Sequence, residues 1–169
     1  ASARIQFFSA QSLGALGEEA AVPALFDLLE ANADKDVFLR HGVVWALHRI
    51  GALEAGWERR DHGSRSVRLA TLLLLRHAAD PRIAHFLRDK DPLLVVEAAR
   101  AIYDLPIEGA MASLAAKADS LRPASEAATQ VGQALHRRVI VATVRLRSGA
   151  GAASPPRHLH NAPTTGSIP

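Results

Sequence analysis

The sequence predicts an all-α protein built from repeated pairs of short helices. Hydrophobic residues make up 49% of the chain but aromatic residues only 5%, so the apolar content is mostly Ala and Leu, which favour helices. The two most strand-like stretches, RVIVATVRL and PLLVVEA, both continue into helical patterns. Five segments also end alike, about 27 to 41 residues apart, which indicates an internal repeat: SLGALG, ALHRIG, LLLRHAAD, AIYDLP and ATVRLRSG.

The first helix of each expected pair is short and amphipathic. Three segments fit this description: residues 20–31, 81–89 and 107–118. In residues 20–31 the apolar side chains recur at helical spacing and form one face: Val22, Leu25, Phe26, Leu28 and Leu29. Such a helix needs neighbours on both sides to finish its core, so we expect the pairs to stack against one another.

Acidic residues mark the expected helix starts. Asp80 and Asp91 each precede a proline, which fits an N-cap followed by proline in the first turn. The DKD stretch that ends at Asp36 has the same role before VFLRHGVVWALHRIG. One first helix is degenerate: residues 53–66 contain two glycines and few apolar positions, so we expect a short helix or a loop attached to the core through Trp57.

The expected domain covers residues 1–148. Residues 149–169 consist mostly of Gly, Ala, Ser, Pro and Thr, and they carry too little apolar surface to offset the entropy of ordering, so we expect a flexible low-complexity tail. The chain starts without Met and within an apparent helix, and we expect it to be a fragment of a longer protein.

The repeat unit resembles a HEAT repeat. Residues 18–51, EEAAVPALFDLLEANADKDVFLRHGVVWALHRIG, resemble one whole unit, with Arg40 early in the second helix and a closing ALHRIG. The resemblance implies a right-handed α-solenoid of about four to five helix pairs. In such arrays the second helices line a concave face on which partners bind.

A narrower resemblance concerns residues 66–116 and LHRRVIVATVRL. These segments look like the HEAT region of large dehydrogenase-like proteins of planctomycete and verrucomicrobial type, which also contain a β-propeller and a c-type haem domain. The resemblance implies an accessory domain of an envelope redox protein, located in the periplasm or cell envelope. None of that family's catalytic positions falls in this stretch.

The sequence contains no recognisable catalytic or cofactor-binding motif. With no Cys, thiolate metal sites, disulfides and Cys-x-x-Cys-His haem attachment are excluded. The eight His do not form a predicted metal site: His41 and His48 are two helical turns apart, His77 and His85 have no acidic residue at ligand spacing, and HLH at 158–160 lies in the tail. We therefore predict no enzyme activity, cofactor or metal. No apolar run reaches the roughly 18 residues of a membrane span.

The predicted function is that of a scaffold or protein-interaction module. Arg40, Glu97 and Arg100 are the expected partner-binding residues on the face formed by successive second helices. Glu97 and Arg100 are also three positions apart on one helix, so an ordinary surface ion pair is the simpler interpretation.

The alternative function is nucleic-acid binding through arginine clusters. The net charge is +3, and the last predicted helix carries a possible basic patch: Arg137, Arg138, Arg145 and Arg147. A second cluster comprises Arg59, Arg60, Arg65 and Arg68. A family of DNA glycosylases is built from HEAT-like repeats with a cationic groove, which is a precedent for this alternative. Glu58 and Asp61 interrupt the second cluster and no aromatic residue is interleaved for base stacking, so we favour a protein partner. A HEAT-like enzyme such as a bilin lyase is disfavoured because no catalytic constellation is visible.

Overall fold

The computed structural model describes residues 2–120, with side chains as far as 117. The predicted tail at 149–169, the domain end at 148 and HLH at 158–160 lie outside the described residues. So does the predicted basic patch of Arg137, Arg138, Arg145 and Arg147.

Within residues 2–120 the regular structure is entirely helical, which confirms the all-α prediction for this part of the chain. The elements in chain order are α1 (Ala3–Leu16), η1 (Glu19–Ala21), α2 (Val22–Asn32), α3 (Val37–Ile50), α4 (Leu53–Glu58), α5 (Arg65–His77), η2 (Pro81–Arg88), α6 (Pro92–Asp104) and α7 (Glu108–Ser120). The elements η1 and η2 are 3₁₀-helices.

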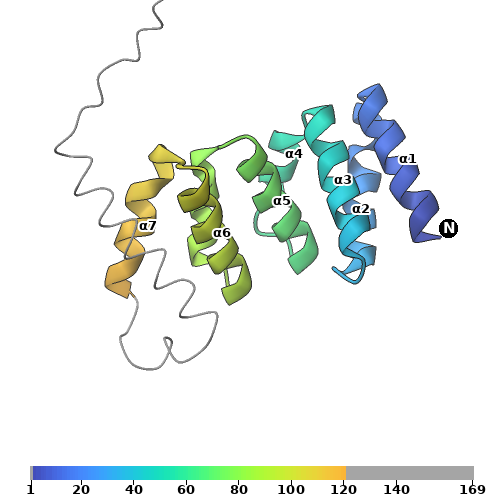
Figure 1. Cartoon of the computed structure of the whole chain (residues 1–169). Helices are drawn as coiled ribbons and strands as arrows, with labels where there is room; N and C mark the ends of the chain where they lie inside the picture. The colour runs from blue at the N-terminus through green and yellow to red at the C-terminus, as the bar shows by residue number, and fades with distance from the viewer. Residues whose placement is uncertain (1, 121–169) are drawn as a thin grey trace, which may run out of the picture.

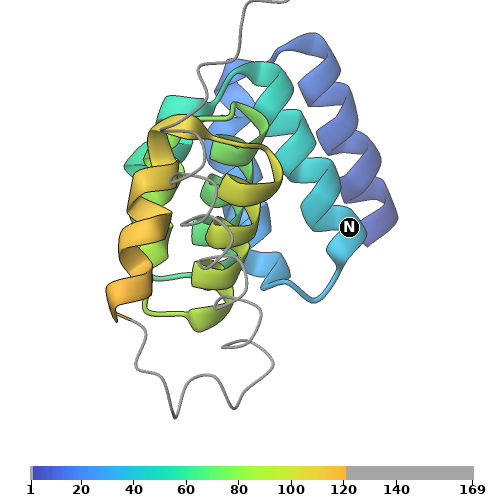
Figure 2. The ribbon, with the colours of Figure 1, turned by 60° about the vertical axis from the view of Figure 1, so that its left-hand side comes forward.

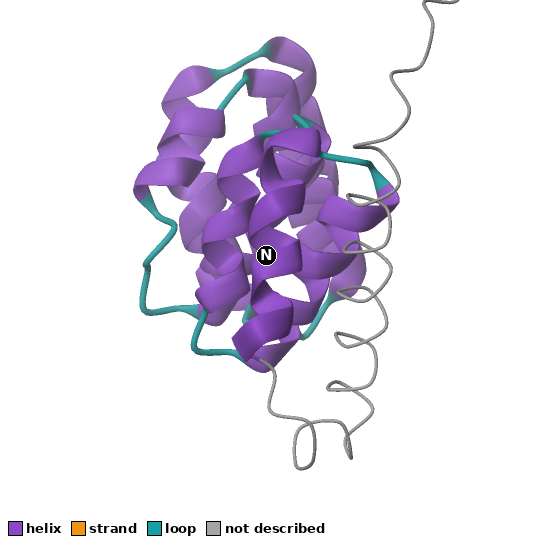
Figure 3. Ribbon diagram, turned by 90° about the vertical axis from the view of Figure 1, so that its left-hand side faces the viewer, coloured by secondary structure: helices purple, strands orange, loops and turns teal. Residues whose placement is uncertain are grey.

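The helices form a row that runs from α1 at one end to α7 at the other (Figure 1). Helices α1, α3, α5 and α6 contact one another in that order along one layer. The shorter elements α2, α4 and η2 lie behind them, with α2 packed on α3 and α5, and η2 packed on α6 and α7. Figure 2 shows the long helices of the first layer side by side, and Figure 3 looks along the row from the α7 end.

The predicted caps hold the starts of three helices. The Asp36 carboxylate accepts hydrogen bonds from the backbone N–H groups of residues 38 and 39 at the start of α3, both at 2.9 Å. Asp80 accepts from the backbone N–H of residue 82 at 2.8 Å, and Asp91 accepts from that of residue 93 at 2.9 Å. Each aspartate thus satisfies backbone donors that a helix start leaves open.

The core consists of two apolar clusters along the row. One is centred on α2 and α3 and extends into α1 and α5, and the other joins α5, η2, α6 and α7. Leu53 and Leu73 pack against both clusters, so the interior continues from one end of the described residues to the other. Trp57 of the short helix α4 packs against the second cluster, as predicted for this degenerate segment.

The segment predicted as an amphipathic helix at 81–89 is a 3₁₀-helix, η2, rather than an α-helix. Because 3₁₀ geometry aligns side chains three residues apart, Ile83 and Phe86 share one face. Both are completely buried. The tighter winding therefore presents two large apolar side chains to the core from only eight residues.

The first two long helices approach each other closely. A Cβ atom added at Gly14 of α1 would lie 2.6 Å from the Cα atom of Ala46 in α3, so only glycine fits there. Two aromatic residues at this end of the row are exposed: Phe8 is 56% accessible and Phe38 is 77% accessible.

Candidate functional site

The three predicted partner-binding residues line one groove. Helices α3, α5 and α6 together form a hollow of about 860 Å³ whose walls include Arg40, Glu97 and Arg100. Arg40 comes from the first turn of α3, whereas Glu97 and Arg100 lie one turn apart on α6. Helix α5 lies between them and contributes Arg76. The stacking of the long helices thus brings together residues almost 60 positions apart in sequence.

A cross-helix ion pair lies in the middle of the groove. Arg76 Nη1 of α5 is 3.0 Å from Glu97 Oε1 of α6, and both side chains are about three-quarters buried. Arg100 Nη1 is 4.0 Å from the other Glu97 oxygen, and Arg100 Nε is 3.4 Å from Asp104. The predicted pair of Glu97 and Arg100 therefore exists, but the shorter contact comes from Arg76, which sequence spacing did not indicate.

The outer arginines of the groove are also held by carboxylates. Arg40 Nη1 is 2.7 Å from Asp34, which lies in the turn before α3. Arg65 Nε is 2.9 Å from Asp91, the N-cap of α6. Partly exposed pairs such as these contribute less than about 1 kcal/mol each to stability. Their main effect here is to orient the guanidinium groups, whose remaining N–H donors can still bind acceptors.

Apolar side chains form the floor and rim between these charges. Leu69 and Leu94 are at most 9% accessible and close the floor. Leu93 and Leu105, each 45% accessible, stand at the rim. An apolar surface flanked by charges that already have partners suits an extended peptide better than a phosphate backbone, because no array of unpaired cations is presented.

A cluster of aromatic rings adjoins the groove and was missed from the sequence. The rings of His48 and His77 are 5.1 Å apart between centroids, and each is 5.3 Å from the ring of Trp45. The pKa of His77 is lowered by burial and by the nearby charges of His48, Arg76 and His41. The available signal was positional: both histidines lie in the last turn of successive long helices.

The histidines do not build a metal centre within residues 2–117. In this region no group of three or more His, Asp or Glu side chains is close enough to hold one ion. His85 does have an acidic neighbour, since its Nε2 is 2.8 Å from Asp61 Oδ1. This carboxylate is 24 residues away in the connection between α4 and α5, so the absence of an acidic residue at ligand spacing in the sequence did not indicate it.

The predicted arginine cluster at 59–68 does not form one open basic surface. Arg68 is only 4% accessible and pairs with Asp89, and Arg65 lies in the groove instead. The guanidinium of Arg59 lies 4.6 Å from the ring centroid of Phe26, and that of Arg60 lies 4.7 Å from that of Trp57. These four arginines are distributed over different surroundings, and Arg68 cannot reach a phosphate backbone.

Comparisons with family models, with curated proteins and with solved structures found no match to this chain. No helix among the described residues is long and apolar enough to span a membrane. The geometry of the groove is consequently the main guide to function.

Proposed function

We propose that this chain is a non-catalytic protein-interaction module, and that its groove over α3, α5 and α6 receives an extended segment of a partner protein. One observation carries the proposal: the groove combines accessible apolar side chains with arginines that are oriented by carboxylates. Apolar anchors provide binding energy, and the remaining N–H donors of the arginines can bind the carbonyl groups of an extended backbone.

The repeat interpretation belongs to the same proposal. Long helices in one layer and shorter elements behind them are the arrangement that a HEAT-like solenoid requires. In this assignment α2 with α3, α4 with α5, and η2 with α6 are three successive pairs. Helix α1 is then the second helix of a preceding pair, and α7 is the first helix of a following one.

The test compares two leucine variants. Peptides selected from a random library against the chain are titrated into Leu93→Asp, whose leucine is at the groove rim, and into Leu16→Asp, whose leucine is 79% accessible at the end of α1. We expect Leu93→Asp to weaken binding at least tenfold and Leu16→Asp to leave it unchanged. Equal binding by both variants would contradict the groove assignment.

Nucleic-acid binding is tested in parallel with labelled duplex DNA at two salt concentrations. A complex that releases counterions from several phosphates weakens by orders of magnitude between 50 and 200 mM salt. We expect no such complex for the described surface, since its groove arginines have carboxylate partners. Tight and steeply salt-dependent DNA binding would favour the alternative function.

The proposed relation to a dehydrogenase-like envelope protein rests on the sequence resemblance alone. It is tested by the reading frame of the source gene, which should continue into a β-propeller on one side and a Cys-x-x-Cys-His motif on the other. Turnover of a redox substrate by the isolated chain would contradict the non-catalytic assignment.

A further inference from the structure

A second hollow lies on another surface and shares no lining residue with the groove. It has a volume of about 920 Å³ and is formed by η2, α7, the start of α5 and the connection that follows α4. Its volume is within the range of small-molecule sites. Its wall contains four basic side chains, those of Arg68, Arg88, Lys90 and Lys117, and two carboxylates, those of Asp61 and Asp89.

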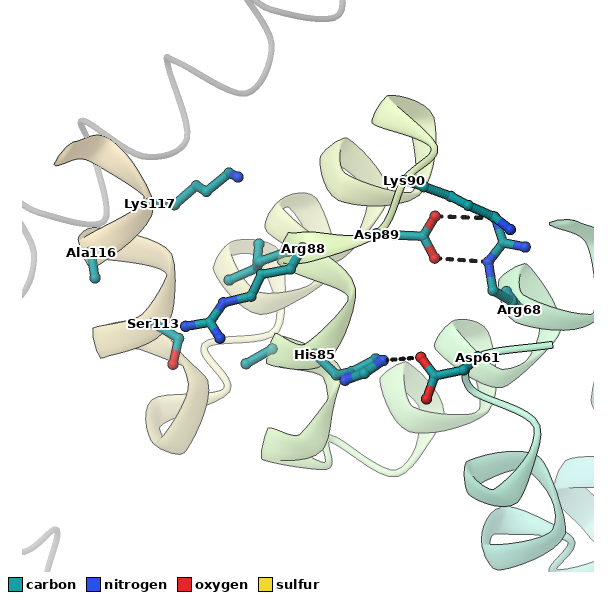
Figure 4. Close-up of a pocket in the computed structure, with 11 residues that line it drawn as sticks. Asp61, Arg68, His85, Arg88, Asp89, Lys90, Ser113, Ala116 and Lys117 are labelled. Atoms are coloured by element: carbon teal, nitrogen blue, oxygen red, sulfur yellow. Dashed lines mark hydrogen bonds and ion pairs between the residues drawn. The ribbon is translucent and has the colours of Figure 1, made fainter. Parts of the chain in front are cut away.

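Both carboxylates of this hollow are already occupied. Asp89 accepts two hydrogen bonds from Arg68, at 2.9 and 3.1 Å, and a third from the backbone N–H of Asp91 at 2.7 Å. Asp61 contacts His85 at 2.8 Å (Figure 4), and its other oxygen is 3.3 Å from Arg60 Nε. Neither acid forms an ion pair with Arg88.

Arg88 is the arginine of this hollow that has no carboxylate partner among the described residues. Within residues 2–117 no carboxylate forms an ion pair with it. Figure 4 shows its guanidinium reaching from η2 toward Ser113 of α7, and Lys117 extends into the same space. Lys90 lies at the opposite wall, where its charge helps to lower the pKa of Asp89.

We infer that this hollow binds a small molecule that carries a phosphate or pyrophosphate group. The guanidinium of Arg88 offers paired N–H donors, Lys90 supplies an ammonium group from the opposite wall, and Ser113 adds a hydroxyl. Donors from different walls suit a tetrahedral group with several acceptor oxygens. A short ligand fits better than a nucleic acid because the exposed carboxylate of Asp61 at the edge of the hollow would repel a continuing phosphate chain.

Titration calorimetry with pyrophosphate tests this site in the full chain at low salt. We expect one saturable site in the wild type, at least tenfold weaker binding in Arg88→Gln, and weaker binding in Lys90→Gln. Arg49→Gln is the matched control, because Arg49 is exposed in the last turn of α3 and lines neither the groove nor this hollow, so its loss should change pyrophosphate binding less than twofold. Circular dichroism checks that each variant keeps its helices.

Three results would overturn the inference. One is equal pyrophosphate binding by Arg88→Gln and wild type. Another is absence of saturable binding in a folded wild-type chain. The third is tighter binding of citrate than of pyrophosphate with the same loss in Arg88→Gln, which would assign the hollow to polycarboxylates instead.

Discussion

Removal of Arg68 should be among the most damaging single changes in the described region. Its side chain is 4% accessible and that of Asp89 is 6% accessible, and the two groups form a bidentate contact. Arg68 Nη1 also donates to the carbonyl oxygens of His62 and Gly63, at 2.9 and 3.1 Å. One guanidinium thus holds the connection before α5, the helix itself and the end of η2 together.

The expected magnitude follows from the charge that the substitution leaves behind. Arg68→Met preserves length and helix propensity but leaves the Asp89 carboxylate buried without its cation, which costs about 3–5 kcal/mol. Arg65→Met is the control on the same helix, because its pair with Asp91 is partly exposed and should cost less than about 1 kcal/mol. Adding Asp89→Asn to Arg68→Met removes the buried charge and should recover more than 1 kcal/mol of the loss.

Urea unfolding followed by circular dichroism and by tryptophan fluorescence measures these free energies of unfolding. The reasoning is refuted if Arg68→Met costs no more than Arg65→Met, or if the double variant is less stable than Arg68→Met alone.

The pair of Arg68 and Asp89 also predicts how stability depends on pH. Burial alone would raise the pKa of Asp89, but the hydrogen bonds and charge of Arg68 outweigh it and lower the pKa. The stabilisation is therefore complete above the unfolded-state pKa of about 4 and is lost as the pH falls through the lower folded-state value.

Three further predictions concern packing, a buried hydroxyl and a titration. Gly14→Ala should destabilise the chain by about 1–3 kcal/mol in urea unfolding, because its Cβ would collide with the backbone of Ala46; full stability would contradict the close α1–α3 contact. Thr71→Val should lower the free energy of unfolding by about 1–3 kcal/mol in the same assay, since the Gly56 carbonyl loses its 3.0 Å hydrogen bond from the buried Thr71 hydroxyl. An unchanged free energy of unfolding would contradict a stabilising role for this hydrogen bond. NMR titration should give His77 a pKa below 6.5, so this group lowers stability as the pH falls below 6.5; an ordinary or raised pKa would refute that.

The helix starts were predictable because their signals are local. Asp36, Asp80 and Asp91 each cap a helix within three residues of themselves, so the adjacent sequence contained the whole interaction. The 3₁₀ winding of η2 was not predictable in this way. An apolar spacing of three residues between Ile83 and Phe86 fits an α-helix and a 3₁₀-helix equally well.

The site was predictable only where the stacking of helices preserves sequence order. Arg40, Glu97 and Arg100 could be assigned to one face because each belongs to a long helix of the same layer. Arg65 and Arg68 are only three positions apart, yet one lies in the groove and the other is buried beside Asp89. What separates them is a partner 21 residues away, which no local pattern reveals.

The ion pairs also indicate how a local change should spread. The pair of Arg76 and Glu97 joins α5 to α6, and the pair of Arg68 and Asp89 joins α5 to the end of η2. Both ion pairs connect neighbouring elements of the row. Helix α1 packs mainly on α3, so loss of Arg68 removes no contact that α1 makes. In the proposed repeat arrangement each unit depends on its nearest neighbours. Hydrogen exchange of Arg68→Met should therefore show loss of protection in α5, η2 and α6 before α1 and α3, whereas uniform loss along the row would mean that the described helices unfold as a single cooperative unit.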